Sequence, residues 1–353
     1  MSWGKCTLAD IVTIKKGEYI TKKDAVSGKY PVILGGKEPA YYINKYNHVG
    51  KAIVISRSGA SAGYVSFWNE PIFITDGFLI EPKQNTTHKF LFYLLKSKQS
   101  ELSGIQRGAA IPHVTPSLIN SINVSLPDLH MQNRIASILS AYDDLIENNQ
   151  KQIKLLEEAA QRLYKEWFVD LRFPGWENTK IVDGVPEGWE KTTLNQIVTF
   201  HRGYDLTKNK MCSGTIPVVG STSIIGYHNQ YKVSGPGIVT GRSGSLGTYQ
   251  LIWDDFWPHN TSLYISDFNG YDIFFIYNLL QTIDFTHLNT GGAIPTLNRN
   301  RLSNINITMP KRHLQRLFSD KVSPLYEKIH ILELSLAKTN ELRSSLLTKV
   351  MKG

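Results

Sequence analysis

The chain contains the same series of short motifs twice, about 185 residues apart. The order of the motifs is the same in both copies, and their spacing drifts by only about three residues along the way. The matching pairs are KKGEYITK (15–22) with HRGYDLTK (201–208), PVILGG (31–36) with PVVGS (217–221), GAAIPHV (108–114) with GGAIPTL (291–297), and SINVSLP (121–127) with NINITMP (304–310). The sequence therefore predicts two homologous domains of ordinary size, about 120 residues each.

A glycine-rich loop that begins with arginine belongs to this series. RSGASAG at 57–63 returns as RSGSLG at 242–247, and in each copy a tyrosine follows the arginine seven residues later, at Tyr64 and Tyr249. Alone, such a loop is a weak signal for phosphate binding. Its recurrence in register makes it part of the framework of a duplicated domain.

Within each copy, short apolar runs are interrupted by glycine, which is typical of β-strands joined by turns. Helical periodicity is weak there, except in one segment per copy. The expected strands include AIVIS (52–56), PIFITDGFLI (71–80), GIVTG (237–241) and SLYIS (262–266), and the expected short helices are KFLFYLLKSKQ (89–99) and IFFIYNLLQTI (273–283). We expect two mixed, mainly β, domains.

Each copy is followed by a long helix. Residues 128–168 contain no glycine or proline, and their apolar positions recur every three or four residues, as in a coiled coil. The predicted seam is Ile135, Ile138, Tyr142, Leu145, Asn149, Ile153, Leu156, Ala160, Leu163 and Trp167. Asn149 would place a polar group in this seam and specify its register, or contact water at a frayed position.

The segment from residue 312 to the end has the same periodicity. Its seam is Phe318, Val322, Leu325, Ile329, Leu332, Leu336, Thr339, Leu342, Leu346 and Val350, and Pro324 predicts a kink or a later helix start. We expect the two helices to pair antiparallel within the chain, with pseudo-two-fold symmetry. The alternatives are that each helix packs on its own domain or on another chain.

The balance of charge favours a polyanionic partner. Lys and Arg number 39 against 30 Asp and Glu, a formal net charge of +9, so nucleic acid is the leading candidate and a basic surface kept for solubility is the alternative. No apolar stretch approaches the roughly 20 residues of a membrane-spanning helix, and the first residues lack a signal-peptide pattern, so we expect a cytoplasmic protein. The two cysteines, Cys6 and Cys212, fit a reducing compartment and do not form a zinc site.

The order of domain, long helix, domain, long helix resembles the specificity subunit of type I restriction-modification enzymes, and the resemblance covers nearly the whole chain. The segment QNRIASILSAYDDLIENNQKQIKLLEEAAQRLYKEWFVDLRFPG (132–175) resembles the central conserved region of that family, and LRSSLLTKVMKG (342–353) resembles its C-terminal conserved segment. Trp3 and Trp189 stand where target recognition domains of the family begin. The resemblance implies an α+β fold with target recognition domains at 1–127 and 189–310, coiled-coil helices at 128–170 and 311–353, and a linker at 171–188.

The resemblance also implies a non-catalytic, cytoplasmic subunit that recognises double-stranded DNA. Each recognition domain would read one half of a bipartite asymmetric site, and the helices would set the spacer. The expected partners are two modification subunits, which methylate adenine at N6, and restriction subunits, which cut and translocate DNA. S-adenosylmethionine, ATP and Mg would be bound only by these partners, with no cofactor and no metal on this chain. The sequence contains no NPPF or DPPY tetrapeptide, no GxxxxGK[ST] loop and no HExxH motif.

Candidate DNA contacts lie in the polar loops of the two repeats. Arginine can take a guanine edge or a phosphate with two hydrogen bonds, and loop serines can bond phosphates. The candidates are Lys37, Tyr42, Arg57, Ser58, Ser61, Arg107, His113, His228, Arg242, Ser243, Ser245, His259, Asn289 and Arg299. The alternatives are a structural pairing of each arginine with a carboxylate, turn chemistry for the serines, a hydrogen bond within the turn for His259, and exposed loops without a ligand for the rest.

Three other functions remain open on the sequence. A stand-alone repressor or orphan recognition module would share every electrostatic feature, and copurification with an adenine methyltransferase would separate it from a subunit. An enzyme that binds a nucleotide or sugar at the glycine-rich loops is disfavoured, because RSGASAG precedes no clear amphipathic helix. A scaffold without DNA contact would show no salt-dependent affinity for duplex DNA.

Overall fold

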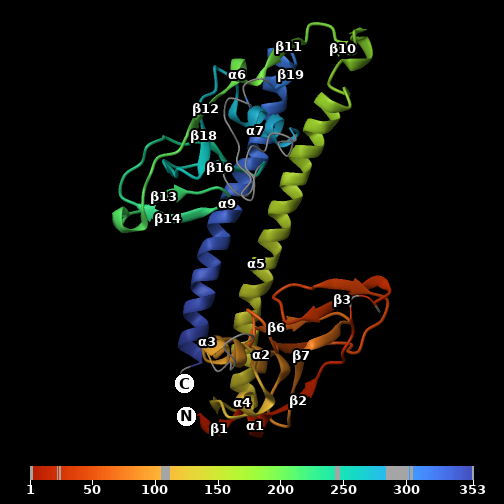
Figure 1. Ribbon diagram of the computed structural model, residues 1–353, viewed down its shortest axis with the longest axis vertical. Helices are drawn as coiled ribbons and strands as arrows, with labels where there is room; N and C mark the ends of the chain where they lie inside the picture. Colours follow the sequence, from red (N-terminus) through yellow and green to blue (C-terminus); the bar gives the residue numbers. More distant parts are fainter. Residues whose placement is uncertain are drawn as a thin grey trace. The chain divides into compact units, whose positions relative to one another are not determined.

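The computed structural model describes residues 3–21, 23, 25–104, 112–242, 247–283, 302 and 305–351. The chain forms two compact units (Figure 1). Unit 1 comprises Met1–Asn148 with Leu336–Gly353, and unit 2 comprises Asn149–Ser335. Each unit holds one copy of the repeat, together with part of each of two long helices, α5 (Leu129–Tyr164) and α9 (Arg312–Val350).

A six-stranded sheet organises unit 1, and β7 lies at its centre. β7 pairs antiparallel with β5 and β2 and parallel with β3, while β6 adds to β5 and β4 to β3. All five residues of β5 are buried, which explains why the first four residues of AIVIS are all apolar instead of alternating with polar ones. The elements are β1 (Gly4–Thr7), α1 (Leu8–Ile11), β2 (Val12–Lys16), β3 (Ser27–Leu34), β4 (Tyr41–Ile43), β5 (Ala52–Ser56), β6 (Val65–Trp68), β7 (Phe73–Pro82), α2 (His88–Ser97), α3 (Gln99–Gly104), α4 (Pro116–Asn120) and β8 (Asn123–Leu126).

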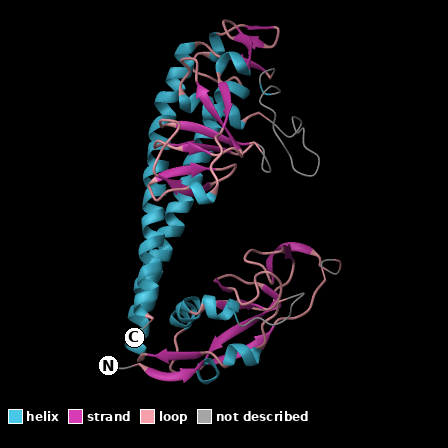
Figure 2. Cartoon of the chain, turned by 60° about the vertical axis from the view of Figure 1, so that its left-hand side comes forward, coloured by secondary structure: helices cyan, strands magenta, loops and turns pink. Residues whose placement is uncertain are grey.

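Unit 2 repeats these connections in two smaller sheets (Figure 2). β18 pairs antiparallel with β12 and β15, β15 with β16, and β17 runs parallel to β13. The continuous β7 of unit 1 therefore corresponds to β17 and β18, which are separated by residues 259–261. The elements are β11 (Glu190–Thr193), α6 (Leu194–Ile197), β12 (Thr199–Arg202), β13 (Ile216–Val219), β14 (Ile224–His228), β15 (Gly237–Gly241), β16 (Tyr249–Ile252), β17 (Trp257–Pro258), β18 (Ser262–Asp267), α7 (Ile273–Gln281) and β19 (Asn306–Met309), with a 3-10 turn at Lys208–Lys210.

The beginning and the end of each globular copy are joined by one antiparallel strand pair, β1 with β8 and β11 with β19. A short helix follows the first strand in both copies, and in both it begins with a capping box. Thr7 pairs with Asp10 in α1, and Thr193 pairs with Gln196 in α6. The duplication predicted from the motifs is therefore present in the pairing of the strands and in the helix starts.

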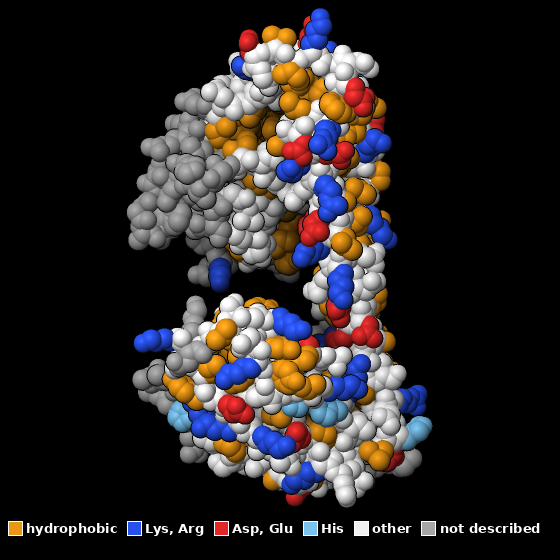
Figure 3. All heavy atoms as spheres, turned by 90° about the vertical axis from the view of Figure 1, so that its right-hand side faces the viewer, with side chains coloured by type: hydrophobic (Ala, Val, Ile, Leu, Met, Phe, Trp, Pro, Cys, Tyr) orange, Lys and Arg blue, Asp and Glu red, His pale blue; other side chains and the backbone are white. Residues whose placement is uncertain are grey.

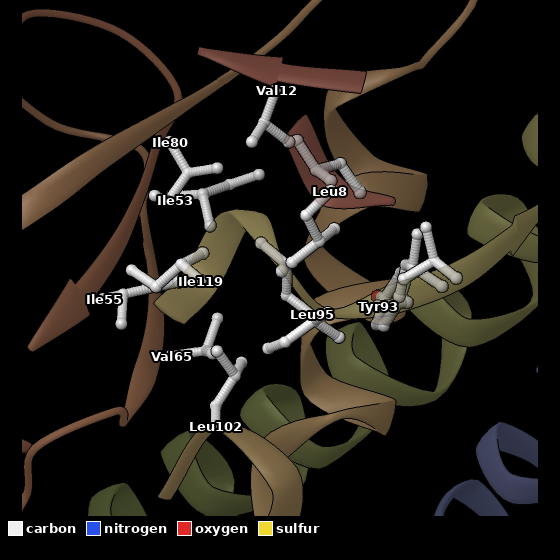
Figure 4. Close-up of a cluster of buried hydrophobic side chains, with 14 of the residues drawn as sticks. Leu8, Val12, Ile53, Ile55, Val65, Ile80, Tyr93, Leu95, Leu102 and Ile119 are labelled. Atoms are coloured by element: carbon white, nitrogen blue, oxygen red, sulfur yellow. The ribbon is translucent and has the colours of Figure 1, made fainter. Parts of the chain in front are cut away.

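A buried apolar cluster lies between the sheet of unit 1 and its helices (Figure 4). The helices of this unit contribute Leu8 from α1, Tyr93 from α2 and Ile119 from α4. The sheet contributes Ile53 and Ile55 from β5. Full burial of such a side chain stabilises the fold by about 1.5–3 kcal/mol. Ile135, Ala136 and Leu139 of α5 belong to the same cluster, so the long helix is part of the core of this unit.

The two long helices pack against each other antiparallel in unit 2. Where α5 enters this unit, Asn149 bonds to Ser335 of α9. At the end of α5, the ring of Tyr164 lies 5.5 Å from that of Phe318, which comes earlier in α9 than Ser335. A single π-helical turn, Lys165–Val169, continues α5, and its Trp167 joins the same core. The predicted pairing within the chain is confirmed for this segment, and α7 packs into the same cluster through Phe275.

In unit 1 the helices are joined by an ion pair between Asp143 of α5 and Arg343 of α9. Leu346 and Val350 of α9 pack against the core cluster of this unit. Each long helix therefore packs on a globular copy as well as on the other helix.

The predicted seams are correct in part. Asn149 is buried, at 3% exposed, as expected of a seam position. Ile138, Leu145 and Leu342 are exposed instead, and Leu139, one residue after Ile138, is buried in the globular core. The burial of α5 in unit 1 is set by contact with the sheet and α2, which a heptad pattern does not include.

One other expectation differs from the structure. α9 begins at Arg312 with Pro324 inside it, so the later helix start is wrong. The predicted linker contains ordered structure, a 3-10 turn at Trp176–Asn178 and a hairpin of β9 (Ile181–Val182) with β10 (Val185–Pro186). Among the described helices, none combines the length and the apolar character needed to span a membrane.

Candidate nucleic-acid interface

The arginine loop of unit 1 is closed by backbone hydrogen bonds at the end of the buried strand β5. The Ser56 amide donates to the Tyr64 carbonyl at 2.9 Å, and the Gly63 amide donates to the Ser56 carbonyl at 2.8 Å. Gly63 has φ +83°, and a Cβ there would lie 2.3 Å from the carbonyl oxygen of Leu102. Only glycine fits at this position, because it combines positive φ with close approach of another backbone.

Asp76, in the middle of β7, holds the first two residues of this loop. The Arg57 Nε donates to Asp76 Oδ1 at 2.6 Å, and the Ser58 hydroxyl donates to Asp76 Oδ2. The Arg57 amide also donates to the Asp76 carbonyl at 3.1 Å. The Arg57 side chain is 40% exposed and that of Asp76 18%, so a largely covered carboxylate orients a guanidinium that still reaches the surface.

The segment after residue 111 pairs with the same loop. Ser58 and His113 form an antiparallel β-bridge, the Val114 amide donates to the Arg57 carbonyl at 2.8 Å, and the Gly59 amide donates to the Pro112 carbonyl at 3.0 Å. A pocket of about 640 Å³ opens beside this contact. It is lined by Ile14, Lys16, Arg57, Ser58, Phe78, His113, Val114, Thr115 and Pro116.

The arginine of unit 2 has the same backbone position but a different neighbour. The Arg242 amide donates to the Thr261 carbonyl at 2.9 Å, which is the counterpart of the bond from Arg57 to Asp76. Threonine offers no carboxylate at this position. The two copies therefore share a framework and differ in how the arginine side chain can be held.

Among the described residues, the other candidate DNA contacts of unit 1 are Lys37, Tyr42 and Ser61. Lys37 is exposed, with its ammonium 5.6 Å from the centre of the Tyr64 ring, and Tyr42 is exposed on β4. The Ser61 carbonyl accepts a 2.9 Å hydrogen bond from the Tyr64 amide, so Ser61 has a role in the turn. Arg57, Ser58 and His113 are brought together at one pocket, and Lys37 lies beside the tyrosine that ends the loop.

The two histidine candidates of unit 2 lie in different environments. His228 is the last residue of β14 and is 6% exposed, so its expected place in an exposed loop is wrong. Its Nδ1 accepts a 3.0 Å hydrogen bond from the Cys212 amide, and its ring lies 5.2 Å from that of Trp257. His259 lies between β17 and β18, and its Nδ1 is 3.0 Å from the Thr261 hydroxyl, as in the alternative of a hydrogen bond within the turn. Arg107, Ser243, Ser245, Asn289 and Arg299 lie outside the described residues.

Sequence reasoning missed three residues of this region, namely Asp76, Lys16 and Lys96. Asp76 is the single charged residue in PIFITDGFLI, and Lys96 follows the apolar run FLFYLL in α2. A charge inside an apolar run is a usable signal, because such a group is paired or functional when it is buried. Within the described parts of the chain, no group of three or more His, Cys, Asp or Glu is placed to hold a metal ion.

Comparisons with known proteins agree with this duplicated architecture. Residues 2–158 and 186–341 each match the family model described as the type I restriction modification DNA specificity domain. The chain is 27% identical to the type I restriction enzyme MjaIX specificity subunit of Methanocaldococcus jannaschii, over 95% of this chain and 86% of that protein. It is 21% identical to the EcoDI specificity subunit of Escherichia coli, over 100% of this chain and 88% of that protein.

The fold also matches a solved structure. The type I restriction-modification S subunit from M. genitalium aligns with a TM-score of 0.72 at 22% identity, over 99% of this chain and 96% of that one. The two matched domains together cover most of the sequence, and both have the same strand pairing. The chain belongs to the family of type I restriction-modification DNA specificity subunits.

Proposed function

We propose that the globular copies of units 1 and 2 each read one half of a bipartite, asymmetric DNA site. The observation that carries this proposal is the pair of arginines at the same framework position, Arg57 beside Asp76 and Arg242 beside Thr261. A shared framework presents equivalent side chains to DNA, and different neighbours change which base edge each can take. Two half-sites of different sequence follow from this difference.

The proposed contact in the first copy depends on orientation. A guanidinium bound through Nε to a carboxylate keeps its planar fork in one direction, which is the geometry that suits a guanine edge or a phosphate. Ser58 and His113 lie at the same pocket as Arg57. The proposed DNA contacts are Lys37, Tyr42, Arg57, Ser58, Ser61, His113, Arg242 and His259, together with Arg107, Ser243, Ser245, Asn289 and Arg299 outside the described residues. His228 is left out because it is buried.

We further propose that the long helices set the spacer and bind the modification subunits. Apolar side chains remain exposed on both helices, among them Leu155 on α5 and Ile331 and Leu334 on α9. Exposed apolar groups on a helix are candidate contacts for another protein. Restriction subunits would join through the same complex in the cytoplasm, and S-adenosylmethionine, ATP and Mg would be bound by the partners. This chain would supply recognition and no catalytic group.

The test is to map N6-methylated adenines in a genome with the chain and its partner subunits, and again after deletion of its gene. A bipartite motif that disappears on deletion supports the proposal. An unchanged methylation pattern, together with specific DNA binding by the chain alone, would point to a stand-alone DNA-binding protein.

A further inference from the structure

Two lysines lie on the ring of Tyr64, the residue that ends the arginine loop of unit 1. The Nζ of Lys96, near the end of α2, is 4.2 Å from the ring centre, and the Nζ of Lys37 is 5.6 Å from it. The ring therefore gathers two ammonium groups from segments far apart in the sequence. We call Lys37, Tyr64 and Lys96 the Tyr64 cluster.

The nearby carboxylate, Asp143, is already occupied. Its Oδ1 binds the Nε of Arg343, and its Oδ2 accepts a 2.5 Å hydrogen bond from the Tyr93 hydroxyl. Among the described residues, neither Lys37 nor Lys96 forms an ion pair with a carboxylate. Figure 3 shows Lys and Arg side chains spread over one face of this unit, with fewer Asp and Glu among them.

The environment of Lys96 disfavours its own charge. Burial, followed by the positive charges of Arg343 and Lys37, lowers the pKa of Lys96 to about 8, although Asp143 acts in the opposite direction. An ammonium kept partly dry beside like charges gains free energy when an anion approaches. The cluster is therefore arranged to receive negative charge from outside the chain.

The positions of unit 2 that match Lys37 and Lys96 carry no lysine. In the alignment of α2 with α7, Gln281 takes the position of Lys96, and it accepts a 2.5 Å hydrogen bond from Gln161 of α5. The turn between β13 and β14 has the sequence GSTS at 220–223 and contains no lysine. A feature present in one of two otherwise matched copies is not required by their shared fold.

We propose that the Tyr64 cluster binds backbone phosphates of duplex DNA beside the half-site read by the first domain. The inference rests on the proposed function, since Tyr64 directly follows the loop of Arg57 and Ser58. Phosphate is the ligand because two ammonium groups from separate segments suit point contacts to anionic oxygens, and because neither has the planar fork with which an arginine selects one base edge. The first domain thus gains a sequence-independent anchor at a place where the matching positions of the second domain carry no lysine.

The experiment measures the affinity of the full-length chain for duplex DNA as a function of salt, for the wild type, Lys37→Gln, Lys96→Gln and the control Lys89→Gln. Lys89 is an exposed lysine on the same helix α2, so the control removes the same charge. The slope of log affinity against log salt is negative. We expect it to become less steep by about 0.9 for each phosphate that a variant no longer neutralises. Lys37→Gln and Lys96→Gln should show this decrease on target and non-target duplexes alike, and Lys89→Gln should not.

A wild-type slope in both cluster variants would overturn the inference. If these variants also lost binding to the modification subunit, the cluster would be a protein-binding surface. If the wild-type chain itself shows no salt-dependent affinity for duplex DNA, alone or with its modification subunits, the result contradicts the proposed function and not only the role of the Tyr64 cluster. Circular dichroism of each variant checks that folding is unchanged.

Discussion

The side-chain amide of Asn149 on α5 donates a 3.1 Å hydrogen bond to the hydroxyl of Ser335 on α9. Asn149 is buried, and the positions that follow it along the interface are mostly apolar, such as Ile153 and Ile329. A polar pair in such an interface fixes which residues face each other, because any shift along the helix leaves a buried amide without its partner.

Replacement of Asn149 by alanine should lower the free energy of unfolding by about 1–3 kcal/mol, since Ser335 loses its partner and a small cavity forms. Asn148→Ala is the control, because Asn148 is exposed. Urea titration measures the free energy of unfolding of both variants. Equal midpoints for the two variants would contradict a role of Asn149 in the helix interface.

Gly63→Ala should destabilise the chain more than Gly59→Ala. Both glycines have positive φ, +83° and +81°, but only at Gly63 does a new Cβ meet another backbone. We expect Gly59→Ala to lower the free energy of unfolding by about 1 kcal/mol through backbone strain, and Gly63→Ala to lower it clearly more. Thermal unfolding of the two variants compares them, and equal losses of stability would show that the close approach to Leu102 relaxes freely.

Arg57→Ala should weaken recognition of one half-site, and Arg242→Ala that of the other. Removal of a bidentate arginine costs about 1–3 kcal/mol, which corresponds to roughly fivefold to 150-fold in affinity. The measurement is the binding of duplexes in which one half of the mapped motif is scrambled. Equal effects of Arg57→Ala on both halves would contradict the assignment of one domain to one half.

Asp76→Asn should act on the same half-site as Arg57→Ala without removing the guanidinium. The variant weakens the ion pair that orients Arg57, so affinity should fall by less than in Arg57→Ala, and selectivity among bases should fall as well. Competition binding with single-base variants of the motif measures selectivity. If Asp76→Asn bound every duplex as the wild type does, orientation by Asp76 would not matter for recognition.

Affinity for DNA should fall between pH 7 and pH 9 through Lys96. With the pKa of Lys96 lowered to about 8, the ammonium is mostly charged at pH 7 and mostly neutral at pH 9, so its attraction for phosphate is lost as the pH rises. The test compares the wild type with Lys96→Gln over this range. Parallel pH profiles would show that Lys96 does not contribute.

The sequence by itself determined the duplication, the mixed, mainly β character of the two domains and the two long helices. These properties follow from motif order, from local periodicity and from helix-forming composition, which are written into neighbouring residues. The place of Asn149 in the helix interface was one of two predicted outcomes, and the structure decided for burial there but for exposure at the seam positions Ile138 and Leu145. The arginine loops were identified as paired motifs in register.

Only the tertiary structure decided what surrounds these residues. Asp76 reaches Arg57 because β7 lies beside β5, and Lys96 meets Lys37 because α2 and the turn after β3 converge on Tyr64. His228 is buried by Trp257, which is far from it in sequence. Contacts of this kind depend on strand pairing and packing between distant segments, and a local pattern contains no information about the partner. The sequence therefore identified the arginines, and the fold determined that the first has a carboxylate beside it and the second a threonine.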